Sequence, residues 1–329
     1  MSNLRAGLIG LGMMGRHHAR NLNALEGVEL VAVADAFGDV HNVAGDVPIF
    51  SDIDDLIEFG IDYCVVAVPT HLHYEIGKKL AAAGVHALIE KPLAGTYAEA
   101  LELAELFETA GLVGAVGHIE RFNSSLQELR RRLNAGDLGN IYQISTSRQG
   151  PFPSRIADVG VIKDLASHDI DLTTWVAGCG YKTVASQSLH KSGREHEDMV
   201  AATGLLLNDV TVNHLVNWLT PTKERRTTVV GAGGMFVADT LTSDLTFFAN
   251  ASVDSEWQEI SHFRGVAEGN VTRFAFPKPE PLRVEHEYLR DAIEGDSSRE
   301  IVTLRQGAEV LRVCEAMLDS SKTGNTITL

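Results

Sequence analysis

The sequence predicts an α/β fold, with a doubly wound parallel sheet in residues 1–119 and an α+β domain built on an open, mainly antiparallel sheet in residues 120–329. In the first part, short apolar runs alternate with segments of helical pattern. Two of these runs, VELVAVA and YCVVAVP, are almost wholly apolar, which is typical of strands that helices cover on both faces. After residue 120 the strand-like runs lie close together, which favours hairpins. The 329 residues fit two domains at roughly 100–200 residues each.

The first part has the order of repeated strand-and-helix units. Strands are expected at residues 6–9, 29–34, 63–68, 86–89 and 113–116. Helices are expected in the intervening segments, at residues 14–25, 52–59, 71–83 and 96–110. Because these segments are long enough for crossover helices, the strands should run parallel.

The second part mixes strands with three helices. Strands are expected at residues 141–147, 200–207, 210–218 and 227–230. Helices are expected at residues 168–176, 282–293 and 304–320. An open sheet leaves one face uncovered, so we expect a homodimer or homotetramer formed through this sheet. The alternative is a monomer whose own helices cover that face.

The charge balance argues against two classes of partner. With 28 basic and 44 acidic residues the net charge is −16, whereas nucleic acid and anionic membranes both require a basic face. No apolar run reaches the roughly 18–20 residues of a membrane span. The start, MSNLRAGLIGLGMMG, enters a glycine loop after one short apolar run, so we expect no secretory signal. The three cysteines lack the spacing of a zinc site; we expect a cytoplasmic protein without a metal.

A glycine loop follows the first expected strand. Gly10, Gly12 and Gly15 have the spacing GxGxxG at the start of a helix. In such a loop the first glycine permits a tight turn, the second lets the backbone approach a pyrophosphate, and the third lets helix pack on strand. The amide groups of the first helical turn, which includes Met13 and Met14, would then face the phosphates. The sequence therefore predicts a dinucleotide site on a Rossmann domain.

An acidic residue at the end of the second strand indicates which dinucleotide binds. Asp35 lies 20 residues after Gly15, the place of a carboxylate that binds the adenosine ribose hydroxyls. The following residues 36–41 contain no arginine to receive a 2′-phosphate, and Asp35 would repel one. We therefore expect NAD rather than NADP.

Further motifs resemble the Gfo/Idh/MocA family of sugar and inositol dehydrogenases. The chain reads AVPTHLHYEIG, then LIEKPLAG, then KDLASHDIDLTTW, and near its end KPEPLRVEHEYLRDAIEG and GNTITL. The resemblance covers both halves and implies a Rossmann domain followed by an open antiparallel sheet. For the cofactor it implies contacts from the glycine loop and from Pro69, Thr70, His73, Glu90 and Lys91. It also implies a cis peptide bond before Pro92, which the residues alone leave open.

Three residues carry the expected chemistry. Lys91 ends a parallel strand at the carboxyl edge of the sheet, where it can stabilise negative charge on a reacting oxygen. Asp164 and His168 are four apart and share one face of a helix. The resemblance equates these three with the family's catalytic trio. Whether Lys91 or His168 takes the hydroxyl proton stays open; we expect His168 to be the base, Lys91 the polarising group and Asp164 the group that positions substrate.

The other histidines of the first part lack such neighbours. They are expected to be structural or exposed: His17, His18, His71 and His86.

Residues 121–163 contain a local excess of basic side chains. They hold seven basic and three acidic residues in a strongly acidic chain. The segments VGHIERFNSS and RQGPFPSRIADVGVIKDLASHDID resemble a UDP-N-acetylglucosamine 3-dehydrogenase-like subgroup, although Ser124 stands where its members usually have proline. Arginine forks suit diphosphate oxygens, so four residues are candidates for substrate binding: Arg121, Arg148, Arg155 and Lys163. The alternative is that these cations are solvated or paired with protein carboxylates.

Three functions remain open at this point. The first is an NAD-dependent oxidoreductase that oxidises a ring hydroxyl of a nucleotide sugar, at C3, such as UDP-N-acetylglucosamine. The second is the same chemistry on an inositol or a free sugar. The third is a non-catalytic NAD-binding regulator, which would have no reason to keep Lys91, Asp164 and His168.

Overall fold

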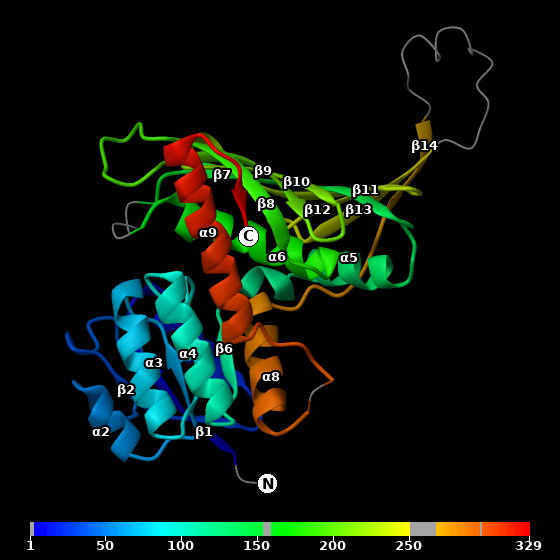
Figure 1. The fold of residues 1–329 in the computed structure, drawn as a ribbon. Helices are drawn as coiled ribbons and strands as arrows, with labels where there is room; N and C mark the ends of the chain where they lie inside the picture. Colours follow the sequence, from blue (N-terminus) through cyan, green and yellow to red (C-terminus); the bar gives the residue numbers. More distant parts are fainter. Residues whose placement is uncertain (1–2, 154–158, 251–267, 297) are drawn as a thin grey trace, which may run out of the picture. The chain divides into compact units, whose positions relative to one another are not determined.

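The computed structural model describes residues 3–153, 159–250, 268–296 and 298–329. The chain forms two compact units (Figure 1). The first unit comprises Met1–Phe122 and Pro279–Glu315, and the second comprises Asn123–Lys278 and Ala316–Leu329. The predicted fold class is confirmed, because a parallel α/β sheet is followed by a mainly antiparallel sheet.

The first unit contains a parallel sheet of six strands. They are β1 (Leu4–Ile9), β2 (Val28–Ala34), β3 (Ile49–Phe50), β4 (Tyr63–Val66), β5 (His86–Ile89) and β6 (Gly114–Val116). Their order in the sheet is β3-β2-β1-β4-β5-β6, so the direction of winding reverses at β1. Ligands of such sheets bind at the carboxyl ends of the strands beside this reversal. The short strand β3 was not predicted.

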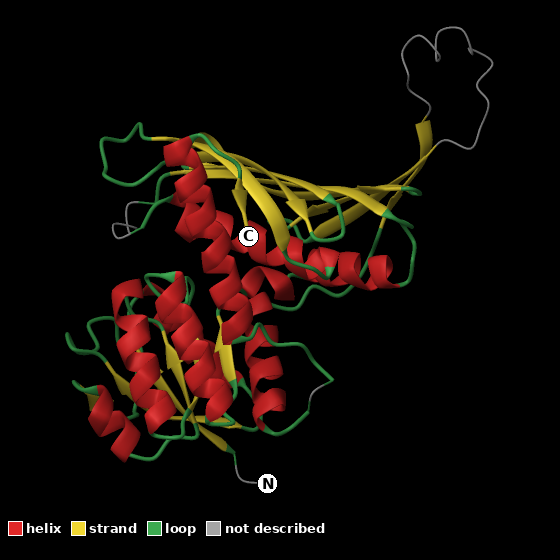
Figure 2. Cartoon of the chain, viewed as in Figure 1, coloured by secondary structure: helices red, strands yellow, loops and turns green. Residues whose placement is uncertain are grey.

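Helices cover both faces of this sheet (Figure 2). They are α1 (Met13–Ala24), α2 (Ile53–Glu58), the 3-10 turn Thr70–Leu72, α3 (His73–Ala82), α4 (Tyr97–Thr109), the 3-10 turn Ile119–Phe122 and α8 (Pro281–Ile293). Successive strand residues point to opposite faces. Leu8 and Val65 thus pack with Leu22 of α1, whereas Ile9 and Val66 pack with Leu80 of α3. The almost wholly apolar strand runs in the sequence reflect this burial on both faces.

The segment 279–315 differs from the prediction, which placed it in the second domain with the rest of 120–329. Leu289 of α8 belongs to the same apolar cluster as Leu22. Thr303 forms an antiparallel bridge with Ala115, next to a hydrogen bond from Val116 N to Val302 O of 2.8 Å. These contacts complete the edge of the first sheet. The sequence pattern showed that these helices exist but not which core they join.

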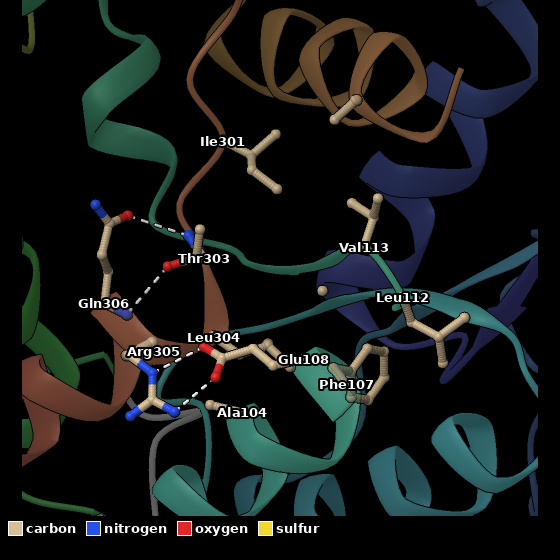
Figure 3. A pocket seen from close by; sticks show the side chains of 12 residues that line it. Ala104, Phe107, Glu108, Leu112, Val113, Ile301, Thr303, Leu304, Arg305 and Gln306 are labelled. Atoms are coloured by element: carbon tan, nitrogen blue, oxygen red, sulfur yellow. Dashed lines mark hydrogen bonds and ion pairs between the residues drawn. The ribbon is translucent and has the colours of Figure 1, made fainter. Parts of the chain in front are cut away.

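Around this edge the chain forms a pocket of about 350 Å³ (Figure 3). Arg305 donates two hydrogen bonds to the Glu108 carboxylate, of 2.8 and 2.6 Å, at its rim. Thr303 and Gln306 bind each other's backbone at the start of helix α9 (Leu304–Thr323). The residues that line the pocket are largely apolar and come from α4, the start of β6, the end of α8 and residues 301–306. They lie at the amino end of β6, away from the carboxyl edge of the sheet.

The second unit contains a sheet of nine strands. They are β7 (Ile141–Pro151), β8 (Tyr181–Leu189), β9 (Met199–Leu206), β10 (Thr211–Asn217), β11 (Leu219–Gly231), β12 (Gly234–Asp239), β13 (Asp244–Asn250), β14 (Glu268–Arg273) and β15 (Ile327–Thr328). The order is β14-β13-β12-β11-β7-β10-β9-β8-β15. All neighbours are antiparallel except β7 and β10, which run parallel.

Among the described residues, the helices of the second unit lie on one face of this sheet (Figure 2). They are α5 (Ser124–Asn134), the π-helical turn Ile162–Ala166, α6 (Ser167–Ala177) and the end of α9. No described helix has the length and apolar composition that crossing a membrane requires.

Candidate active site

In the glycine loop between β1 and α1, two glycines have no room for a side chain, whereas Gly12 faces open space. Gly10 has a φ of +90°, and a Cβ there would lie 2.5 Å from Ala67 O. A Cβ on Gly15 would lie 1.9 Å from Gly10 O. At Gly12 no described heavy atom lies within 4 Å of an added Cβ. The loop therefore leaves room at the one glycine where a pyrophosphate must approach the backbone.

The amino end of α1 suits an anion. Among the described residues, no side chain caps this helix and its first turn contains no acidic residue. The amide groups of its first residues, Met13 and Met14, therefore have no carboxylate competing for them, and the helix dipole adds a positive end. The dinucleotide predicted from the spacing fits this loop.

Asp35 lies at the carboxyl end of β2, facing the glycine loop. Its Oδ2 accepts a hydrogen bond of 2.8 Å from Leu11 N, and its Oδ1 accepts one of 2.8 Å from Phe37 N. The two bonds fix the carboxylate between the first and second strands. Each carboxylate oxygen keeps a second acceptor position, which a ribose hydroxyl can use.

The segment after β4 forms another side of the carboxyl edge. Pro69 is exposed and Thr70 starts the 3-10 turn that leads into α3. The ring of His73, which was expected to contact the cofactor, is buried. Its Nδ1 lies 2.9 Å from Pro92 O and its Nε2 lies 2.9 Å from Val68 O. The ring thus joins the loops after β4 and β5.

The carboxylate of Glu90 binds two groups of the protein. Its Oε1 lies 3.0 Å from Nε2 of His18, and its Oε2 accepts a bond of 3.1 Å from Lys91 N. Burial by itself raises the pKa of Glu90. The hydrogen bond from His18, the charges of His18 and Lys91 and the Lys91 amide outweigh burial and hold that pKa below its usual value. The carboxylate therefore stays ionised near neutral pH.

Lys91 follows β5 at the carboxyl edge and is partly buried. The peptide bond between Lys91 and Pro92 is cis, as the resemblance implied. Asp164 and His168, by contrast, belong to the second unit and are both buried there.

Asp164 and His168 lie on one continuous helical segment that starts earlier than predicted. Asp164 is in the π-helical turn Ile162–Ala166, and His168 is in the first turn of α6. Glu197 holds the start of this segment, because its Oε1 accepts a bond of 2.9 Å from Ile162 N. A π turn is a rare local widening that occurs frequently at functional sites.

Arg148 is paired with a protein carboxylate, which was the alternative to substrate binding for the basic residues of 121–163. Its Nε donates a bond of 2.7 Å to Asp169 Oδ1, and its side chain is 5% exposed. Thr146 donates a bond of 3.0 Å to the other oxygen of Asp169 and lies 2.7 Å from Nδ1 of His214. Tyr181 completes this buried network, with its hydroxyl 2.6 Å from Nε2 of His214.

The other three basic candidates have different environments. Arg121 is buried in the first unit, where its Nη1 donates a bond of 3.1 Å to Gln306 Oε1. Lys163 is partly exposed in the π-helical turn. Arg155 lies outside the described residues.

Comparison with known proteins identifies the family. Residues 4–118 match "Oxidoreductase family, NAD-binding Rossmann fold" of Gfo/Idh/MocA proteins, and residues 126–237 match the C-terminal domain of the same family. UDP-N-acetylglucosamine 3-dehydrogenase from Acidithiobacillus ferrooxidans is 32% identical over 218 residues, which are 65% of this chain and 67% of that protein. The chain belongs to the Gfo/Idh/MocA family. It is an NAD-dependent oxidoreductase, and its residues 4–118 form the NAD-binding domain.

Solved structures of other dehydrogenases also match this chain. The solved structure of the Acidithiobacillus enzyme superimposes with a TM-score of 0.85 at 26% identity, over 97% of this chain and 98% of that one. The WlbA dehydrogenase from Bordetella pertussis, solved with NADH and UDP-GlcNAcA, shares the fold at 23% identity, over 99% of each chain, with a TM-score of 0.80. The scyllo-inositol 2-dehydrogenase (NAD⁺) of Bacillus subtilis is 30% identical over 55% of this chain, which spans 56% of that enzyme's length.

Three further residues of this family member have environments that their sequence context does not indicate. His18, expected to be structural or exposed, is buried and forms one chain of contacts with His286 and Glu90. Arg194 is stacked on the rings of Phe152 and Trp218, with its Cζ 4.2 and 4.8 Å from their centroids. Arg194 is 20% exposed, and its loop leads to Glu197. No local pattern marks the two histidines, because their partners lie far along the chain.

Among the described residues, no group of three or more His, Cys, Asp or Glu side chains could hold a metal ion.

Proposed function

We propose that this oxidoreductase oxidises a ring hydroxyl of a nucleotide sugar, at C3, with UDP-N-acetylglucosamine as the leading candidate. The likeness to UDP-N-acetylglucosamine 3-dehydrogenase carries this proposal, because it extends over 97% of the chain in structure and is 32% identical in the matched part of the sequence. In this proposal the protein binds a small sugar substrate. It also associates with further copies of the same chain through the open sheet. We keep the cytoplasm as the proposed compartment.

NAD is the proposed cofactor in preference to NADP. Support comes from Asp35, whose carboxylate is fixed beside the glycine loop by Leu11 and Phe37. A 2′-phosphate at the adenosine ribose would meet this negative charge, whereas two hydroxyls would find acceptors. Gly10, Gly12 and Gly15 would form the pyrophosphate cradle.

In the proposed reaction His168 takes the hydroxyl proton, Lys91 stabilises negative charge on the reacting oxygen, and Asp164 orients the substrate. Bound NAD supplies the hydride acceptor. A histidine is the ordinary choice for proton transfer near neutral pH. A cation beside a developing oxyanion lowers the barrier most where water is excluded, and Lys91 is partly buried.

On the substrate side, the structure changes which cations the proposal uses. Removing Arg148 and Arg121 leaves Lys163 and Arg155 from the original set, and we add Arg194. Arg194 is more exposed than Arg148, two aromatic rings hold its guanidinium, and its ion pair with Asp198 is long, with 3.7 Å between Nη2 and Oδ1. A fixed, partly exposed guanidinium suits a diphosphate oxygen pair.

Oxidation of an inositol or a free sugar is a second candidate. The burial of Arg121 and Arg148 favours it, because an uncharged substrate needs few cations. Relatives named as inositol dehydrogenases add to it, including the Bacillus enzyme.

One assay separates these candidates. Purified chain is mixed with NAD and a panel of UDP-sugars, inositols and aldoses, and reduced nicotinamide is followed by absorbance. UDP-N-acetylglucosamine should be oxidised, and raised salt should weaken its binding while leaving that of neutral sugars almost unchanged. Efficient oxidation of an inositol, with no calorimetric binding of UDP-N-acetylglucosamine, would overturn the nucleotide-sugar proposal.

Variants test the catalytic roles. Lys91→Ala and His168→Ala should each lower turnover on the order of 10²–10⁴-fold, because each removes a positioned group that acts in the transition state. Affinity for NADH, measured by fluorescence titration, should change little. A variant with wild-type turnover removes its residue from the mechanism. Oxidation of none of the panel, with intact NADH binding, would favour the regulator.

A further inference from the structure

A chain of buried polar groups lies directly behind Lys91. His286 Nε2 on α8 lies 2.9 Å from His18 Nδ1 on α1, and His18 Nε2 lies 3.0 Å from Glu90 Oε1. The second oxygen of Glu90 accepts the bond from Lys91 N. Both rings are fully or almost fully buried, and they meet edge to face with centroids 5.1 Å apart. All four residues belong to the first unit.

The two carboxylate oxygens of Glu90 bind different partners. One oxygen faces a histidine from a helix, and the other holds the backbone amide of the lysine at the end of β5. A buried ionised carboxylate is costly unless its hydrogen bonds are made. The position of Glu90 is therefore set by His18, and the position of the Lys91 backbone is set by Glu90.

A glycine lies next to the Glu90 carboxylate. A Cβ on Gly117, which follows β6, would lie 3.0 Å from Glu90 Oε2 and 3.1 Å from its Cδ. Glycine at this position leaves the space that the carboxylate occupies. The carboxylate is thus enclosed by α1 on one side and the end of β6 on another.

We propose that His18, supported by His286, is a positioning residue for Lys91: it holds the Glu90 carboxylate against the Lys91 amide and so fixes where the lysine leaves the sheet. This rests on the role proposed above for Lys91. It also gives α8, a helix from the far end of the chain, a part in the site.

The test compares His18→Ala with a rescue and a control in the full chain. In His18→Gln the amide can still donate to Glu90, whereas His17→Ala changes an exposed neighbour on the same helix. We expect His18→Ala to lower kcat on the order of 10²-fold, as small misplacements of catalytic groups do. His18→Gln should recover most of the loss, and His17→Ala should equal wild type. The affinity for NADH should be unchanged in all three.

A second readout needs no substrate. A short pulse of acetic anhydride labels lysine amines, and mass spectrometry gives the ratio of labelled Lys91 to the exposed reference Lys182. The ratio should rise in His18→Ala, because the lysine is no longer held, and return to the wild-type value in His18→Gln. An unchanged ratio in a folded His18→Ala overturns the proposal.

The pH profile separates positioning from a general packing defect. The groups acting on Glu90 are His18 from α1 and Lys91 beside it; His286 from α8 contacts His18, and Gly117 brings no side chain. Without His18, burial raises the pKa of Glu90, so the acid limb of kcat should move to higher pH. A loss of kcat that leaves this limb in place overturns the proposal.

Two outcomes separate this proposal from the proposed function. Wild-type turnover in Lys91→Ala would remove the function assigned to Lys91, whatever His18 does. If His18→Ala does not fold, Glu90→Ala replaces it: this variant removes the acceptor of both the His18 and the Lys91 N bonds, so the same loss of kcat and rise in Lys91 labelling are expected. Wild-type values for Glu90→Ala would overturn the positioning role.

Discussion

Asp35 performs two tasks with one carboxylate. It ties the glycine loop to the loop after β2 through Leu11 N and Phe37 N, and it presents negative charge where the adenosine ribose is expected. The double variant Asp35→Ser with Ala36→Arg should shift preference toward NADP, because it replaces repulsion of a 2′-phosphate by a guanidinium contact. Fluorescence titration with NADH and NADPH measures this. Tighter binding of NADPH by wild type would show that the loop has been misinterpreted.

Two neighbouring glycines should respond to alanine in opposite ways. Gly15→Ala places a methyl group against Gly10 O and should destabilise the fold by about 1–3 kcal/mol. Gly12→Ala meets open space, so the free energy of unfolding should stay within about 1 kcal/mol of wild type. Its affinity for NADH should nevertheless fall. Urea denaturation measures the change in stability, and NADH titration measures the change in affinity. Wild-type affinity in Gly12→Ala would contradict the proposed pyrophosphate site at this loop.

Residues whose role depends on neighbours in sequence could be predicted from the sequence. Gly10, Gly12 and Gly15 are such residues, since the turn, the helix start and the strand end are local. His18 could not, because its partners Glu90 and His286 lie 72 and 268 positions away. A distant partner changes an apparently ordinary histidine into part of the site.

At the scale of elements, the Arg148–Asp169 ion pair connects strand β7 to helix α6, one residue after His168. Arg148→Ala should destabilise the chain by about 3–5 kcal/mol, because it leaves the Asp169 charge buried and uncompensated. Arg131→Ala, which breaks an exposed pair with Glu128 on α5, should cost at most about 1 kcal/mol. Urea denaturation compares the two. Wild-type stability of Arg148→Ala, with weaker UDP-sugar binding, would instead restore Arg148 as a substrate contact.

Helices and strands of the first unit were predicted well because their apolar periods are regular. The second unit was harder. The start of its helix at residues 162–166 was missed because a π turn interrupts the α-helical period. Strands β8, β12, β13, β14 and β15 were not predicted either. In β13 buried and exposed residues do not alternate regularly, so its sequence lacks the period of a half-buried strand.

For the whole molecule, buried histidines should make stability depend on pH. Burial lowers the pKa of His214 to about 4, although Asp169 opposes this, and burial also lowers the pKa of His286. Unfolded histidine takes up its proton near pH 6.5, so between about 6.5 and 4 the unfolded state binds more protons. Stability that is complete above pH 6.5 should therefore be lost as the pH falls toward 4, with His214 contributing on the order of 3 kcal/mol.

Urea denaturation at pH 8 and pH 4.5 checks this dependence. His214→Gln should lose less stability between the two values than wild type does, because it has no proton to take up. His17→Ala, in an exposed position, should keep the wild-type difference. An identical difference in His214→Gln would show that His214 does not cause the acid sensitivity.

The division into units was predicted less well than the fold within each. A boundary near residue 120 follows from the change in strand spacing, and the structure divides the chain between Phe122 and Asn123. The return of residues 279–315 to the first unit has no local signal. Amphipathic helices such as α8 carry an apolar face but no indication of which sheet it covers.

This return has a consequence for how the chain is made. A ribosome adding roughly 5–20 residues per second finishes Phe122 some 10–30 s before it reaches the segment at 279–315. During that interval Leu22 and Val116 lack Leu289 and Leu304, their later partners in the apolar clusters. The nascent first unit therefore exposes hydrophobic surface while the second unit is translated. Chaperones can bind this surface during that interval. A chain that ends before residue 279 lacks α8 and the start of α9, so the apolar clusters of its first unit stay incomplete.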